Sequence, residues 1–388
     1  MRVALVHDWL TGMRGGERVL EELIGLFPRA DIHTLLHVPG STSEAIEQRP
    51  VSTSPLSRLP GVRRYYRWLL PLFPWAVSRL RIRDADLVIS VSHAVAKGAT
   101  IEADAPHLCY CLTPMRYVWD QADAYLGRGL RRALARPLLA RLRAFDRKTS
   151  GASRVQQFVG TSRTVCDRIQ RHYGRSATLV HPPVDVERIR PDGRPADDFY
   201  LLVAAFVPYK REFLAIEAFR RLGARLLVVG DGPGRRRLER AAPENVRFLG
   251  HVGEAELARL YARCRALVYP QEEDFGIVAV EAQAAGRPVI AYGRGGATET
   301  VLPLGGAAVG GPTGVWFEEP TPEGLLAALR CFEESQPSFR SEVMRRNAER
   351  FSRERFRRKF GAVVDSFLAV HDVRARRPAA AAGLGGGS

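Results

Sequence analysis

Short apolar runs alternate with longer amphipathic segments along most of the chain. The first run, residues 3–6, is rich in β-branched side chains, as in a strand that is buried on both faces. Apolar residues then recur at helical spacing from Leu20 to Phe27. Further strand-like runs, separated by helix-like segments, lie at 85–92, 107–112 and 154–162. This pattern predicts an open parallel sheet with helices between its strands.

The same alternation starts again after a proline-rich passage at residues 181–198. The second series of strand-like runs lies at 199–206, 225–230, 245–250, 266–270 and 288–292. The sequence therefore predicts an α/β fold with two Rossmann-like, doubly wound domains that face a central cleft. The expected parts are an N-terminal domain at 1–190, a C-terminal domain at 191–351, a helix at 352–371 able to pack across to the N-terminal domain, and a disordered tail at 372–388.

The chain is strongly basic, which narrows the class of partner. Of its 388 residues, 58 are Lys or Arg and 42 are Asp or Glu, so the formal net charge is +16. Such an excess favours anionic partners: nucleic acid, membrane surfaces or anionic ligands. Only four of the basic residues are lysines, so an arginine-biased composition with an ordinary solvated surface is the alternative.

Cysteine usage and hydropathy predict a cytoplasmic protein. The five cysteines form no C-x-x-C pair and no disulfide framework, which fits a reducing compartment. The apolar start is too short for a signal sequence, because His7 and Asp8 interrupt it. No run of 18 apolar residues exists, so no membrane-spanning helix is expected.

Carboxylates cluster in the loop that follows the strand-like run 266–270. Glu272, Glu273 and Asp274 precede a predicted helix, and Glu281 lies inside it. Carboxylates only accept hydrogen bonds, so they suit ligands rich in hydroxyl groups, such as sugars and ribose. The alternative is that acids before a helix favour its dipole, which explains the first three residues but not Glu281.

The segment "EDFGIVAVE" resembles the E-x7-E signature of retaining GT-B glycosyltransferases of group 1, or family 4. Other segments that resemble this family, in order along the chain, are "HDWLTGMRGGERVLE", "LPGVRRYYRWLLPLFP", "DLVISVSHAVAKG", "TPMRYVWD" and "VPYKREFLAIEAF". The wider pattern is similar to the mannosyltransferase-like branch that assembles O-antigens and exopolysaccharides. The resemblance reaches to about residue 370 and implies a GT-B fold.

The resemblance assigns donor-binding roles in the C-terminal half. It implies that Glu273 contacts hydroxyls of the donor sugar and that Glu281 binds the nucleotide ribose. Backbone N–H groups of Phe275, Gly276 and Ile277 are expected to reach the sugar.

Cations for the donor diphosphate are expected beside these carboxylates. The resemblance implies that Lys210 and Arg211 hold the diphosphate. Many relatives carry an additional Arg a few residues before the Lys, where this chain has Ala204 and Ala205. The second cation is therefore expected from Arg211 or from Arg294. A plain helix-end charge is the alternative for Lys210, although a cation opposes the dipole there.

In the N-terminal half the resemblance points to a glycine pair and a histidine. Gly15 and Gly16 open a helix, so a phosphate or sugar could approach the backbone closely. His93 matches a position that hydrogen-bonds the donor sugar, whereas a second family histidine is replaced by Leu112. A plain glycine turn and a structural histidine are the alternatives. Arg116, Tyr117 and Trp119 are expected on the acceptor side.

A second glycine cluster, "GDGPG" at 230–234, resembles a dinucleotide-binding loop, but its glycines are not spaced as in such loops. It lacks the G-x-G-x-x-G pattern and the acid about 20 residues later that a ribose contact requires. We interpret it as a structural or phosphate-proximal turn.

Two arginine-rich segments carry interleaved aromatic and leucine residues. Residues 58–83 contain seven arginines and no acid, and residues 128–148 are similar. This composition suits an interfacial contact with an anionic membrane. An arginine-biased solvated face and a nucleic-acid surface are the alternatives, but no recognition motif supports the latter.

Together these features predict a retaining glycosyltransferase that moves a hexose, with mannose from GDP-mannose preferred, to a glycan or polyprenyl-linked acceptor in cell-surface polysaccharide synthesis. No cofactor or metal is expected, because no D-x-D follows a strand and Lys210 and Arg211 supply positive charge. Two alternatives stay open: another GT-B enzyme, such as a sugar-nucleotide epimerase or a phosphorylase, and a non-catalytic protein that binds nucleic acid or membranes.

Overall fold

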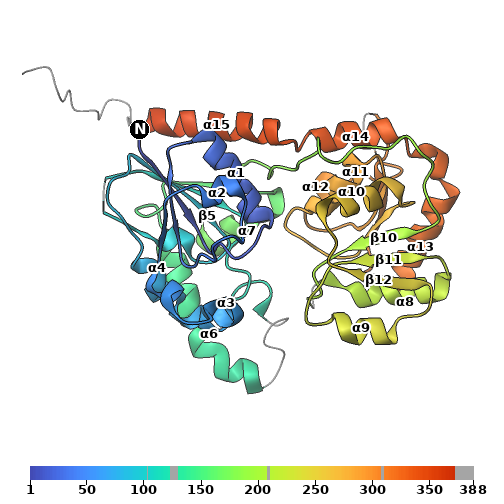
Figure 1. Ribbon diagram of the computed structural model, residues 1–388, viewed down its shortest axis with the longest axis horizontal. Coiled ribbons are helices and arrows are strands. Elements are labelled where there is room, and N and C mark those ends of the chain that lie inside the picture. Colours follow the sequence, from blue (N-terminus) through green and yellow to red (C-terminus); the bar gives the residue numbers. More distant parts are fainter. Residues whose placement is uncertain (103, 123–129, 208–209, 307–309, 372–388) are drawn as a thin grey trace, which may run out of the picture. The chain divides into compact units, whose positions relative to one another are not determined.

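The computed structural model describes residues 1–102, 104–122, 130–207, 210–306 and 310–371 (Figure 1). The chain divides into two compact units. Unit 1 comprises residues 1–111, 144–159 and the chain from 357 onward, and unit 2 comprises residues 112–143 and 160–356. The predicted domain boundary near residue 190 stays a prediction. The predicted disordered tail lies outside the described residues, as do residues 128–129 of the second arginine-rich segment.

The first sheet has seven strands in the order β3-β2-β1-β5-β7-β8-β9. Strand β1 pairs in parallel with β2 and β5, and β5 pairs in parallel with β7. Every residue of β1 and β5 is buried, which explains why both strands are mostly apolar and do not alternate with polar residues facing solvent. The strands are β1 (Val3–His7), β2 (Asp31–Thr34), β3 (Val51–Thr53), β5 (Leu87–Ser92), β7 (His107–Cys111), β8 (Gln157–Gly160) and β9 (Ala177–Leu179).

Helices and short 3₁₀ segments connect these strands. The α-helices are α1 (Gly15–Leu26), α2 (Glu44–Glu47), α3 (Val62–Tyr65), α4 (Phe73–Ser78), α6 (Leu130–Thr149) and α7 (Arg163–Tyr173). The 3₁₀ segments are η1 (Pro55–Arg58), η2 (Tyr66–Leu72) and η3 (Ala96–Gly98), and a two-stranded sheet joins β4 (Arg81–Ile82) to β6 (Thr100–Ile101).

The second sheet has six strands in the order β12-β11-β10-β13-β14-β15. Its strands are β10 (Tyr200–Val203), β11 (Leu226–Val229), β12 (Val246–Gly250), β13 (Leu267–Tyr269), β14 (Val289–Tyr292) and β15 (Gly314–Phe317). Its helices are α8 (Glu212–Leu222), α9 (Arg235–Ala241), α10 (Glu254–Arg263), α11 (Ile277–Ala284), α12 (Ala297–Thr300), α13 (Pro322–Glu334) and α14 (Ser341–Glu349), with the 3₁₀ segment η5 (Gln336–Ser338).

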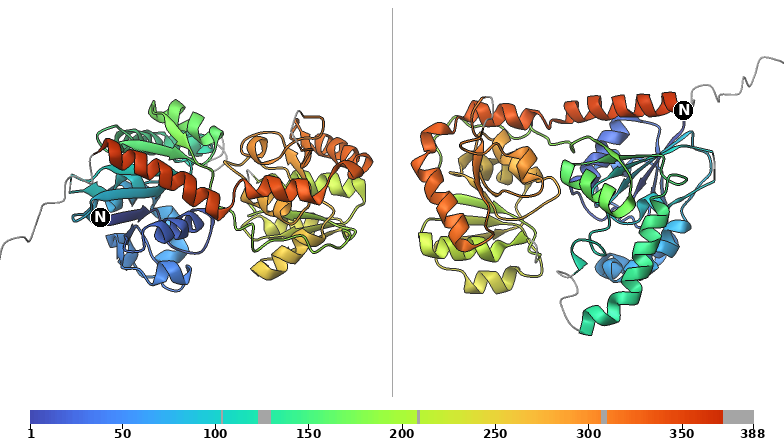
Figure 2. Two further views of the ribbon diagram at one scale, coloured as in Figure 1. Left: turned by 90° about the horizontal axis from the view of Figure 1, so that it is seen from above. Right: turned by 180° about the vertical axis from the view of Figure 1, so that it is seen from behind.

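Both faces of this sheet are buried. Successive residues of β10 enter different cores, because side chains alternate along a strand: Leu201 packs with α10 and α11, and Leu202 packs with α8 and α13. Figures 1 and 2 show these helices on the two sides of the sheet. The prediction of parallel sheets covered by helices is confirmed for both halves of the chain.

The last helix, α15 (Arg353–Val370), is continuous in Figure 2 and matches the predicted helix at 352–371 to within a residue at each end. Within unit 1 it packs through Phe360, whose ring lies 5.8 Å from that of Tyr110. Arg357 also forms an ion pair with the buried carboxylate of Glu22 at 2.5 Å.

Candidate active site

Lys210 and Glu273 come together from two separate loops of unit 2. Lys210 follows β10, and Glu273 follows β13, which is the next strand in the sheet. Parallel neighbours end at the same sheet edge, so their loops meet there. The Lys210 Nζ forms an ion pair with the Glu273 Oε1, and both side chains are largely buried. The structure therefore joins two of the predicted site residues directly.

Burial lowers the pKa of Lys210 from its ordinary value, and the positive charge of Arg116 acts in the same direction. The carboxylates of Glu212 and Asp274 oppose this effect. A charged lysine in such a place depends on nearby anions to stay charged. The Glu273 carboxylate, which pairs with the Lys210 ammonium group, is one such anion.

Arg211, the next residue, is strained and incompletely paired. Its φ of 55° is the only positive φ of a non-glycine residue among the described residues. Its guanidinium lies 4.4 Å from the ring centroid of Tyr292, and its buried NH1 has no hydrogen-bond partner in the described part of the chain. Left-handed backbone at a non-glycine residue costs free energy and concentrates at functional sites. Arg211 thus offers a buried, unused N–H group next to Lys210.

Ala204 and Ala205 stand where many relatives carry an additional arginine, and the backbone is tightly packed there. Ala204 is buried, and a Cβ on Gly230 would overlap its carbonyl oxygen. Gly230 also has a φ of 132°, which favours glycine. The "GDGPG" turn therefore packs against the loop after β10, and its first residue, Gly230, must be glycine for this packing.

The loop that carries Glu273 is held by its neighbours. The Gly296 N–H donates to the Glu273 carbonyl oxygen at 2.8 Å. Gly276, the N-cap of α11, has a φ of 92°, and a Cβ there would lie 2.6 Å from the Tyr269 hydroxyl. Phe275 is buried at this turn, and Ile277 begins the helix. The predicted sugar-facing segment 275–277 is thus a fixed strand-to-helix turn, and its contact with a sugar stays a prediction.

Glu281 lies in the second turn of α11 and is buried. Tyr261 on α10 donates its hydroxyl hydrogen bond to the Glu281 Oε2 at 2.9 Å, and the Arg188 NH2 lies 3.7 Å from the Oε1. Burial and the charge of Glu281 raise the pKa of Tyr261 well above its ordinary value, so the hydroxyl stays a donor. Sequence reasoning missed Tyr261, because nothing local links it to a residue 20 positions later.

Asp274 has more partners than its interpretation as a helix-end charge allows. Its two carboxylate oxygens accept hydrogen bonds from Arg116 and Arg168. Trp119 stacks on His172, with ring centroids 4.6 Å apart and planes 18° apart. Arg116 and Trp119 therefore have structural partners within unit 2. The acceptor role predicted for them and for Tyr117 stays a prediction.

The predicted site residues of unit 1 lie at the carboxyl edge of the first sheet. The helix α1 begins at Gly15, after β1, as predicted for the glycine pair Gly15 and Gly16. His93 follows β5, the parallel neighbour of β1. Its Nδ1 lies 3.0 Å from the Asp8 Oδ2, and the Trp9 ring packs edge-on against it at 4.5 Å.

Asp8 organises the backbone around His93, a role that sequence reasoning missed. Its buried carboxylate accepts hydrogen bonds from four consecutive backbone N–H groups, at 2.6, 2.9, 2.7 and 2.7 Å, in residues 93–96. Burial opposes ionisation of Asp8, but the charge and hydrogen bonds of His93 hold its pKa well below the ordinary value. A carboxylate at the end of a buried strand was the available signal, since such a group requires strong partners.

Family models match the two halves of the chain. Residues 13–188 match the model described as Glycosyltransferase Family 4, and residues 185–351 match the model described as Glycosyl transferases group 1.

Individual proteins agree with these matches. A D-inositol 3-phosphate glycosyltransferase of Geodermatophilus obscurus is 34% identical over 243 residues, which cover 54% of this chain and 51% of the relative. A GDP-mannose-dependent monoacylated alpha-(1-6)-phosphatidylinositol monomannoside mannosyltransferase of Corynebacterium glutamicum is 34% identical over 176 residues, 37% of this chain and 46% of the relative. The chain spans about half the length of the curated relatives that it matches.

A solved structure extends the likeness to the whole fold. Sucrose-phosphate synthase from Thermosynechococcus elongatus superposes with a TM-score of 0.71 at 18% identity, covering 95% of this chain and 100% of that one. At this identity the likeness bears on the fold alone.

Proposed function

Because the chain joins a Glycosyltransferase Family 4 domain to a Glycosyl transferases group 1 domain in a GT-B fold, we propose that it transfers a hexose from a nucleotide-sugar to an acceptor hydroxyl with retention of configuration. The observation that carries the proposal is the meeting of Lys210 with Glu273 at the carboxyl edge of the second sheet. A cation for phosphate and an acceptor for sugar hydroxyls lie side by side there, as a nucleotide-sugar requires.

In this mechanism Lys210 and Arg211 stabilise the diphosphate as the bond from its oxygen to the anomeric carbon breaks. Negative charge grows on the leaving oxygen, and fixed cations in a buried place lower the barrier most at that stage. Glu273 orients the sugar through its hydroxyls. The acceptor oxygen bonds to the same face of the anomeric carbon and passes its proton to the departing phosphate. No protein nucleophile is required.

Mannose from GDP-mannose is our preferred donor, and a glycan or polyprenyl-linked saccharide of the cell-surface polysaccharides, such as lipopolysaccharide, is the preferred acceptor. The similarity to the GDP-mannose-dependent mannosyltransferase of Corynebacterium glutamicum supports this donor, as does the resemblance of the sequence pattern to mannosyltransferases. We also propose peripheral membrane contact at the cytoplasmic face through residues 58–83 and 128–148. No helix within the described ranges has the length and apolar character needed to cross a bilayer.

A thermal-shift screen with GDP-, UDP- and ADP-sugars tests the donor. A bound donor raises the melting temperature, since it binds the native state only. GDP-mannose is expected to give the largest shift, and a subsequent assay with acceptor saccharides should yield a glycosylated product. Conversion of the sugar in the absence of acceptor would instead identify an epimerase. If none of these donors shifts the melting temperature, the proposed reaction is rejected.

Glu281→Gln is expected to weaken donor binding by about tenfold, because a charged acceptor for ribose hydroxyls becomes a neutral one and charge-assisted hydrogen bonds are the stronger class. Isothermal titration calorimetry with the donor found in the screen measures this. Glu272→Gln, which removes a nearby acid that has no assigned ligand contact, is the matched control and should bind normally. Unchanged affinity in Glu281→Gln would reject the ribose role.

Activity is expected to survive EDTA, because protein cations neutralise the leaving diphosphate in the proposed mechanism. Initial rates before and after chelation, and after Mg²⁺ or Mn²⁺ is added back, give the measurement. A rate that falls with EDTA and returns with metal would contradict the assignment of this role to Lys210 and Arg211.

A further inference from the structure

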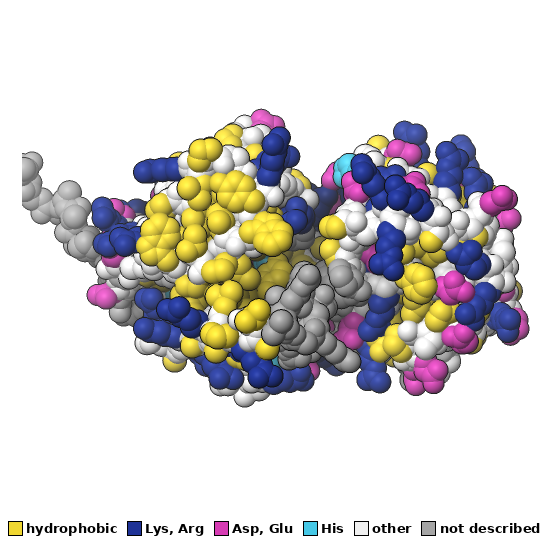
Figure 3. All heavy atoms as spheres, turned by 90° about the horizontal axis from the view of Figure 1, so that it is seen from below, with side chains coloured by type: hydrophobic (Ala, Val, Ile, Leu, Met, Phe, Trp, Pro, Cys, Tyr) yellow, Lys and Arg dark blue, Asp and Glu magenta, His cyan; other side chains and the backbone are white. Residues whose placement is uncertain are grey.

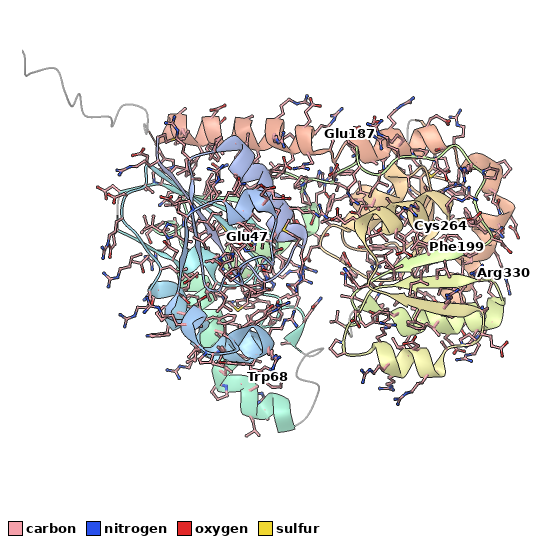
Figure 4. The ribbon with its side chains drawn as sticks, viewed as in Figure 1. Glu47, Trp68, Glu187, Phe199, Cys264 and Arg330 are labelled. Atoms are coloured by element: carbon pink, nitrogen blue, oxygen red, sulfur yellow. The ribbon has the colours of Figure 1, made fainter. Side chains whose placement is uncertain are left out.

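Large apolar side chains gather on one face of unit 1 (Figure 3). Trp68 is 84% exposed, Trp75 47%, Leu72 46% and Leu59 38%. Trp68 lies at the periphery of the unit, on η2 (Figure 4). We call Leu59, Trp68, Leu72 and Trp75 the aromatic patch. A group of exposed aromatic and aliphatic residues on one face marks an interaction surface rather than ordinary surface exposure.

The segment that carries the aromatic patch is firmly attached to the unit. Tyr66 and Phe73 are buried, and their rings lie 5.5 and 5.8 Å from that of Trp9. Pro71 lies within η2, and α4 has a proline in its first turn, so the segment folds as short pieces rather than one long helix. The buried side chains supply the core contacts. The outward-facing apolar side chains are exposed and therefore available to bind a partner outside the unit.

Positive charge surrounds the aromatic patch. The segment 58–83 holds seven arginines and no acid. Arg81 and Arg83 pair with Glu102. The remaining five form no ion pair in the part of the chain that the structure describes; they are Arg58, Arg63, Arg64, Arg67 and Arg79. The partner is therefore expected to be negatively charged as well as able to accept apolar side chains.

We propose that the aromatic patch inserts into the interfacial layer of a bilayer rich in anionic lipids, with Trp68 and Trp75 at headgroup depth and the arginines on lipid phosphates. Tryptophan prefers this layer because one end of its ring system is apolar and the other is polar. Basic residues next to the surface add attraction to anionic lipids.

Two other partners fit less well. In a two-fold symmetric dimer the same surface meets itself, so these five arginines, which form no ion pair among the described residues, would face the same five on the other protomer. Single-stranded nucleic acid would gain from stacking on tryptophan, but Leu59 and Leu72 offer no ring to stack on. An anionic bilayer can accept the tryptophan rings, the leucine side chains and the arginines together. The inference rests on the membrane contact proposed above and names its partner.

Flotation with vesicles of 30% phosphatidylglycerol in phosphatidylcholine, compared with pure phosphatidylcholine, tests the proposal. Wild-type protein should bind the anionic vesicles at least tenfold better and lose binding as NaCl rises. Trp68→Ser with Trp75→Ser should reduce binding by about tenfold or more, because insertion strength follows buried apolar area. Val370→Ser, which removes an equally exposed apolar residue (80%) at the end of α15, should bind like wild type.

Several outcomes would overturn the inference. Equal binding to both vesicle types, unchanged binding of the double variant, or a dimer in light scattering that the double variant loses would each reject it. The thermal shift with nucleotide-sugars is measured on the same variants and should not change. A protein that binds vesicles through the aromatic patch but binds no donor would leave this inference standing while the proposed reaction fails.

Discussion

Lys210→Ala is expected to lower kcat by about 10²–10³-fold, the usual cost of removing one group that stabilises developing negative charge. Donor affinity should fall far less, because the charge on the leaving oxygen is greatest in the transition state. The largely buried ion pair with Glu273 holds the ammonium group close to the carboxylate for which we propose the sugar contact. Steady-state kinetics and calorimetry on the same preparation give the two quantities.

Lys359→Ala, which removes an exposed lysine on α15, is the matched control and should leave both quantities unchanged. Equal losses in kcat and in donor affinity would mean that Lys210 binds ground state and transition state alike. An unchanged kcat would remove Lys210 from the mechanism. Lys210→Arg separates charge from geometry, since it keeps the charge but replaces a compact ammonium with a planar group.

The sequence predicted the two sheets because their strands are short apolar runs. Strands such as β13 and β14 are buried on both faces, and this requirement leaves a local signal. The position of Glu273 at a sheet edge followed from the order of strand, loop and helix alone. Lys210 was expected near these carboxylates because the pattern around both resembles one family. That β10 and β13 are neighbours, and so bring the two residues together, is seen only in the folded chain.

Contacts between distant residues left no such signal. The two arginines on Asp274 come from segments 158 and 106 residues away, and the hydroxyl on Glu281 comes from α10, which precedes β13 in the sequence. Each side chain has an ordinary local context, so only the folded chain identifies the pairs. The same holds for Arg211, since its positive φ and its buried NH1 depend on how the loop after β10 meets Tyr292.

Asp8→Asn is expected to lower the free energy of unfolding by about 2–4 kcal/mol. The asparagine keeps one carbonyl oxygen, but its NH₂ group faces N–H donors, so about two of the four backbone N–H groups of residues 93–96 lose their acceptor. Each buried donor without a partner costs about 1–3 kcal/mol. Urea denaturation followed by circular dichroism measures the change. Asp84→Asn, at an exposed ion pair of 3.7 Å, is the control and should change stability by less than about 0.5 kcal/mol.

The pH dependence of this difference distinguishes a buried carboxylate from a generally weakened fold. The pKa of Asp8 is held below its ordinary value in the native state, so its stabilisation is complete above the unfolded-state pKa near 4 and declines as the pH falls further. The asparagine side chain of the variant has no proton to gain. The difference in unfolding free energy between wild type and Asp8→Asn should therefore shrink as the pH falls below about 4. A difference that stays constant to pH 3 would mean that the negative charge of Asp8 does not contribute to the stability of the fold.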